Sequence, residues 1–184
     1  MPLAFPSHQG LILPIADRWR IDTVALSIGA ALPDIVELFF WPIRGELGQW
    51  IGHSLLGVIL FIPIGLVLTA IMRRVTPTPW LRHLDRFGRQ STLNASIAIA
   101  IGSLAHVISD FVTHANFVLF VPFYESDHIF PAWWTHAWSS VDLLVYRKPY
   151  PIAPHTIVWF LASVLGIILF ARFVRDTARA RKTS

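Results

Sequence analysis

The sequence of 184 residues has no cysteine and few charges. Without cysteine the chain can form no disulfide, no thiolate metal site and no cysteine nucleophile. Charged residues make up 14% of the chain and hydrophobic residues 54%, whereas soluble domains carry about 25% charged residues. This balance argues against a water-soluble enzyme and against a disordered segment. It predicts a small integral membrane protein with a single domain.

Four apolar segments are long enough to cross a bilayer, which takes roughly 17–25 residues. We expect membrane-spanning helices over 22–41, 54–72, 92–122 and 156–174. Residues 3–16 form a shorter apolar stretch, which cannot span alone and suits a re-entrant half-helix or an interfacial segment. The predicted fold class is therefore all-α, a polytopic membrane protein with about four transmembrane helices.

The basic residues follow the apolar runs rather than forming a nucleic-acid surface. Ten of the fifteen Lys and Arg lie in residues 73–89 and 172–184. Basic segments beside membrane helices usually face the cytoplasm. We therefore expect loop 73–89 and the C-terminal tail 175–184 to be cytoplasmic, with residues 123–155 forming an outer loop. The predicted location is the inner (plasma) membrane, and the predicted partner is the lipid bilayer, with no nucleic acid.

Residues of the kinds that bind metals gather at the outer end of these predicted helices. His53 precedes the second helix, His106, Asp110 and His114 occupy the outer half of the third, and Asp34 lies in the first. Ionisable side chains at membrane depth usually pair, bind ions or line polar cavities. A divalent metal would compensate their desolvation, and a set of oxygen and nitrogen donors suits zinc or another transition metal.

The spacing of the His and Asp residues along the third predicted helix indicates which of them could bind the same metal ion. Four residues advance a helix by about 6 Å and rotate it by about 40°. His106 and Asp110 can therefore reach one ion, and Asp110 and His114 can reach another. This geometry predicts Asp110 as a bridge if two metals are bound.

The order of these motifs resembles that of a known family. The chain reads Pro6-Ser7-His8, Pro33-Asp34, His53 and then His106-x3-Asp110-x3-His114. This order resembles the bacterial membrane family catalogued as domain of unknown function 4184. It is also similar, more remotely, to membrane-bound metal-dependent hydrolases and to the superfamily of zinc-dependent phospholipase C and single-strand nucleases. Those soluble enzymes cleave phosphoesters with a zinc cluster.

The resemblance implies a ligand set, residue by residue. Asp34, His53, His106 and Asp110 would hold one zinc, and His8 would join Asp110 on another. The soluble enzymes also use a free N-terminal Trp amine and a His-x3-Glu pair. This chain begins with Met1, and no such pair follows His114. One or two metals are therefore expected rather than three.

Two functions are consistent with these residues. The first is a metal-dependent hydrolase with Asp110 as a catalytic residue, acting on a phosphoester or phospholipid-like substrate at the outer membrane interface. The alternative is a non-catalytic metal-binding or structural membrane protein, whose His/Asp cluster holds helices together. A transporter with an Asp/His relay is a third hypothesis, but the inner halves of 54–72 and 156–174 are almost purely apolar.

The other histidines carry weaker expectations. Because Arg18 and Arg20 precede the first full helix, simple topology puts the N-terminus inside, and His8 would face away from the cluster. A re-entrant segment 3–16 would bring it back. His136 and His155 are expected to be solvated or interfacial residues rather than ligands.

Overall fold

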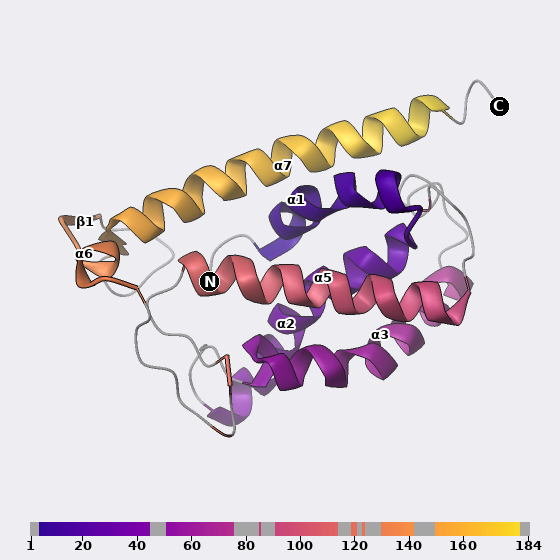
Figure 1. Ribbon diagram of the computed structural model, residues 1–184, viewed down its shortest axis with the longest axis horizontal. Coiled ribbons are helices and arrows are strands. Elements are labelled where there is room, and N and C mark those ends of the chain that lie inside the picture. The colour runs from indigo at the N-terminus through magenta and orange to yellow at the C-terminus, as the bar shows by residue number, and fades with distance from the viewer. Residues whose placement is uncertain are drawn as a thin grey trace.

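The computed structural model describes residues 4–44, 51–75, 85, 91–113, 119–120, 123, 130–141 and 150–180. Within these ranges, long helices form a bundle (Figure 1): α1 (Ala4–Trp19), α2 (Thr23–Arg44), α3 (Leu55–Val75), α5 (Thr92–Thr113) and α7 (Pro154–Ala180). The shorter elements are the 3-10 turn η1 (Ile51–His53), helix α6 (Ala132–Thr135) and the strands β1 (Ser139–Val141) and β2 (Tyr150–Ile152). The two strands pair antiparallel as a small ribbon beside α6.

Four of these helices are long and apolar enough to cross a membrane, namely Thr23–Phe40, Leu55–Val75, Thr92–Val112 and Pro154–Arg179. Their outward faces expose large apolar side chains, such as Ile59 and Val67 on α3 and Phe160 and Leu161 on α7. Soluble proteins rarely expose contiguous apolar faces of this kind, whereas a helix in lipid satisfies its own backbone and needs an apolar surface. The predicted all-α, polytopic membrane fold is confirmed.

The predicted and observed helix boundaries differ most for α5 and α7. α5 ends at Thr113, and Leu119 and Phe120 lie outside it, although the sequence predicted helix up to residue 122. The Leu119 carbonyl accepts a hydrogen bond from the Leu55 N–H at 2.9 Å, so the chain has already returned to the start of α3. α7 continues to Ala180, because its last turns contain no Gly or Pro and are rich in Ala and Arg, which favour helix.

The two ends of the bundle differ in character. One end, here called the site end, holds the starts of α1, α3 and α7 and the ends of α2 and α5, on the left in Figure 1. The other, the basic end, holds the ends of α1, α3 and α7. There Arg73 Nη2 lies 3.0 Å from Oδ1 of the fully buried Asp22, whose N–H donates to Asn94 Oδ1 at 2.8 Å. This contact joins the starts of α2 and α5 to the end of α3.

Close contact between α2 and α5 forms the centre of the bundle. Leu26 and Leu32 of α2 and Ile99 of α5 are fully buried. Ser103 Oγ of α5 donates to the Gly29 carbonyl of α2 at 2.9 Å. Small residues allow this approach, which fixes the register of the two helices that carry most of the site.

α1 covers the segment expected to be a half-helix or interfacial segment, and it is too short to be one of the candidate membrane spans. At 1.5 Å per residue its 16 residues extend about 24 Å. It packs against α7 and α2, and it touches α7 through glycine. A Cβ added at Gly10 would overlap the backbone oxygen of Gly166. α1 is thereby held inside the bundle with its first turns at the site end.

The contact at Gly10 gives a stability prediction. Gly10→Ala must push α1 away from α7, and such overpacking costs about 1–3 kcal/mol. We expect a lower unfolding midpoint in detergent for this variant. Ala171→Val adds carbon to an exposed position of α7 and should leave the midpoint unchanged. An unaltered midpoint in Gly10→Ala would contradict the close packing of these helices.

Candidate metal centre

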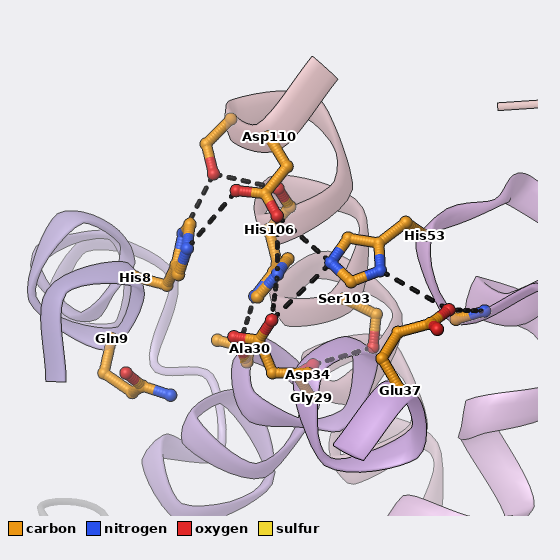
Figure 2. A network of polar contacts seen from close by, with 12 residues as sticks. His8, Gln9, Gly29, Ala30, Asp34, Glu37, His53, Ser103, His106 and Asp110 are labelled. Atoms are coloured by element: carbon orange, nitrogen blue, oxygen red, sulfur yellow. Dashed lines mark hydrogen bonds and ion pairs between the residues drawn. The ribbon is translucent and has the colours of Figure 1, made fainter. Parts of the chain in front are cut away.

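Four side chains that could hold a metal meet at one point inside the site end (Figure 2). Asp34 comes from α2, His53 from η1, and His106 and Asp110 from α5. One donor atom of each lies within 4.8 Å of the others. Three of the four residues are buried, and Asp34 is partly exposed. These are the four residues that the resemblance assigned to a single zinc.

The donor atoms lie close enough together to share one metal ion. Asp110 Oδ2 lies 3.1 Å from His53 Nε2 and 3.2 Å from His106 Nε2. Asp34 Oδ1 lies 3.6 Å and 3.7 Å from the same two nitrogens. Bonds of about 2.0–2.1 Å at tetrahedral angles separate neighbouring donors by about 3.3–3.5 Å. The four measured separations lie on either side of this range, so the geometry fits one transition-metal ion.

The tautomer of His106 follows from its surroundings. Its Nδ1 lies 2.7 Å from the Ala30 carbonyl, which can only accept, so Nδ1 carries the proton and donates. In the neutral ring, Nε2 then presents a lone pair to the carboxylates of Asp34 and Asp110. This buried nitrogen has no hydrogen-bond partner among the described residues. A carbonyl that orients an imidazole in this way is typical of the outer shell of a metal site.

His53 has the same arrangement, with a carboxylate behind it. Its Nε2 faces Asp110 and Asp34, while its Nδ1 lies 3.7 Å from Glu37 Oε1. Glu37 is buried and also accepts the Gly52 N–H at 3.2 Å. A carboxylate behind a histidine fixes the ring and raises its basicity as a ligand. Although Glu37 was not predicted as a site residue, it follows Asp34 by three positions and therefore shares its helix face.

Opposing effects act on the pKa of His53. Burial lowers the pKa of this imidazole, but its contacts with the carboxylates of Asp110, Asp34 and Glu37 outweigh burial and raise the pKa well above the ordinary value of 6.5. The surroundings therefore favour a positive charge at this point, which either a proton or a metal cation can supply.

His8 belongs to the same cluster and lies beside Asp110, as the resemblance implied and as simple topology did not. Its Nε2 lies 3.4 Å from Asp110 Oδ1, and its ring stacks on His106 with centroids 3.9 Å apart. Ser109 Oγ donates to the His106 carbonyl at 2.8 Å and lies 2.9 Å from His8 Nδ1, so it accepts the Nδ1 proton. The simple topology argument failed because α1 runs with its start at the site end.

Asp110 therefore lies between three imidazoles. Its Oδ2 faces His53 and His106, and its Oδ1 faces His8 (Figure 2). The predicted bridging role of Asp110 thus has a geometric basis, with His8 on the second side. His114, the other predicted partner on that side, lies outside the described residues.

The remaining predicted histidines do not join the cluster. His136 is exposed, as expected. His155 is buried, so the expectation of a solvated or interfacial residue was wrong. Its Nδ1 lies 3.0 Å from the Trp134 carbonyl, and the Trp134 indole N–H donates to the Val112 carbonyl at 2.9 Å. This histidine ties the start of α7 to α6 and the end of α5, and has a structural role.

A comparison with protein families identifies the chain's relatives. One family model matches residues 1–183. The chain belongs to the family described as domain of unknown function (DUF4184). No curated protein and no solved structure matches it. Membership of the DUF4184 family confirms the resemblance read from the motif order, but it assigns no chemistry, which must be argued from the site.

The position of Glu37 gives a prediction about affinity. Glu37→Gln keeps an acceptor for the Gly52 N–H but removes the negative charge behind His53. Loss of such an outer-shell carboxylate typically weakens metal binding about 10–100-fold. Competition with a chelator on purified protein would measure this change, and the unfolding midpoint would show that the fold persists. Equal affinity in wild type and variant would contradict the role given to Glu37.

Proposed function

We propose that this protein is a membrane-embedded metal-dependent hydrolase with its site at one end of the helix bundle. The observation that carries the proposal is that two imidazole nitrogens and two carboxylate oxygens lie within 4.8 Å of one another in a largely buried place. A proton on His53 can offset only one of the two negative charges of Asp34 and Asp110, and the rest of the desolvation cost of these carboxylates is uncompensated. A zinc-type ion satisfies all four donors at once.

Asp34, His53, His106 and Asp110 would hold this ion. A divalent metal in such a site lowers the pKa of bound water towards about 7 and polarises a phosphoryl oxygen. The Ala30 carbonyl accepts the Nδ1 proton of His106 and leaves Nε2 of that ring facing the ion. Glu37 lies behind the Nδ1 of His53, and binding of the ion would displace the proton from His53 Nε2. The remaining carboxylate oxygen, Asp110 Oδ1, together with His8 Nε2, offers a place for a second ion, as the resemblance implies.

The surroundings of His8 support a substrate with an apolar part. A small pocket of about 90 Å³ lies between α1 and α5, beside His8, His106 and Ser109. Its other walls are apolar, formed by Leu11, Ile12, Ile15 and Ala105. Pockets that enclose a small molecule measure about 300–1,000 Å³, so this one can take only part of a ligand. A phosphoester with a lipid-like chain could leave the rest of its length in the bilayer.

The presence of four candidate protein ligands favours the alternative, a non-catalytic metal site that holds helices together. Structural zinc sites use four protein ligands, whereas catalytic sites keep one position open. Asp34 distinguishes the two cases, because its oxygen lies farther from the imidazoles than that of Asp110 and its side chain is 16% exposed. For catalysis this carboxylate must leave room for water and substrate.

The decisive prediction concerns metal content. Purified wild type should contain one or two zinc-type ions per chain, measured by elemental mass spectrometry. His106→Ala and Asp110→Asn should each lose the ion that the four residues share, because each removes a donor. His155→Gln, a buried histidine outside the cluster, should keep it. A metal-free wild type prepared without chelators would contradict the proposal.

Hydrolysis of a chromogenic phosphodiester and of a phospholipid in mixed micelles then separates the two functions. Turnover that disappears with the metal in Asp110→Asn, and persists in His155→Gln, identifies a hydrolase. The structural alternative is identified if the protein binds stoichiometric metal, loses stability when the metal is removed, and turns over neither substrate.

A further inference from the structure

A second cavity lies at the basic end, far along the bundle from the candidate metal centre. It has a volume of about 600 Å³, within the range of small-molecule pockets. Among the described residues, its walls come from the last turns of α3, the first turn of α5 and Asp85, and include Leu66, Thr69, Ala70, Arg73, Arg74, Asp85, Thr92 and Ala95. Nothing in the proposed hydrolase uses this cavity.

The two arginines of this cavity differ in their partners. Arg73 Nη2 is shared between Asp22, at 3.0 Å, and Asp85, at 3.2 Å. Two carboxylates therefore face this one guanidinium. Arg74 is exposed, and among the described residues no carboxylate lies within ion-pair distance of it. Arg74 thus adds to the cavity wall a guanidinium that no described carboxylate pairs with, and the exposed Thr92 adds a hydroxyl donor from α5.

The cavity also has an apolar side that faces the middle of the bundle. Ala70 and Leu66 lie about one and two helical turns before the arginines on α3, and Ala95 lies on α5. The two helices are candidate membrane spans that end and begin at this level, at Val75 and Thr92. The charged rim therefore lies where lipid headgroups would be, and the apolar wall lies where their chains would be. Basic pockets between membrane helices are known to bind anionic headgroups.

We propose that this cavity binds the phosphate group of an anionic amphiphile, with Arg74 as its principal contact. Arg74 and the Thr92 hydroxyl hold the phosphate oxygens, and Leu66, Ala70 and Ala95 contact the adjoining chain. The apolar wall favours a lipid over free phosphate, which has no use for it. This inference does not depend on the metal centre or on any hydrolytic activity.

The test is lipid binding by the full chain in an uncharged detergent, measured by native mass spectrometry with phosphatidylglycerol, phosphatidylcholine and inorganic phosphate as separate probes. We expect phosphatidylglycerol to bind most tightly. One arginine near the membrane surface contributes about 1 kcal/mol, so Arg74→Gln should weaken binding about fivefold. Arg175→Gln, which removes an exposed arginine of α7 that pairs with Asp176, is the matched control and should change it less than twofold.

Ala70→Leu provides a second variant, because it fills the cavity and keeps every charge. It should weaken phosphatidylglycerol binding and leave binding of inorganic phosphate unchanged. The assignment to a lipid would be overturned if inorganic phosphate bound as tightly as phosphatidylglycerol and Ala70→Leu changed neither affinity. Equal losses in Arg74→Gln and Arg175→Gln would overturn the site itself, since general attraction to basic residues would then explain the binding.

Discussion

A carboxylate held between three imidazoles at membrane depth is the constraint on which the rest of this structure depends. Asp110 faces His53 and His106 with one oxygen and His8 with the other. Such a group is costly in a bilayer unless a cation and hydrogen bonds compensate it. Each imidazole has a protein group behind its Nδ1, so its other nitrogen faces the carboxylates. The helices therefore place nitrogen and oxygen atoms around a point where a positive charge is stabilised, rather than forming an ion pair whose charges cancel.

The packing of the bundle serves this positioning. Gly10 and Gly166 allow α1 to lie against α7, which brings His8 beside Asp110. The contact of Ser103 with Gly29 fixes α5 against α2, and the next turns of these helices carry the site's carboxylates. Small residues at helix contacts thus determine where the polar side chains meet. The function of the apolar helices is to hold that arrangement in lipid.

Much of this could be predicted from local patterns. The four spans follow from run length, and the His106–Asp110 pair follows from helical spacing, since both depend on neighbours in sequence. The place of His8 followed from the resemblance but not from the apolar and charge patterns, because it depends on the direction in which α1 packs. Glu37 and Asp22 were missed for a related reason: each acts through a partner far away in the chain, His53 and Arg73 respectively.

The solvent-exposed fractions of the clustered side chains indicate whether a substrate could reach the site. Among the clustered donors, the side chains of His53 and His106 are closed off at 1% and 0% exposed, whereas those of Asp34 and His8 are 16% and 12% exposed. A purely structural site gains nothing from exposed ligands, because water weakens the electrostatic attraction that holds the ion. Here the partly exposed donors are Asp34, whose oxygen is the farther from the imidazoles, and His8, which lines the apolar pocket between α1 and α5. Access from the bilayer at that side is what a hydrolase of amphiphilic substrates requires.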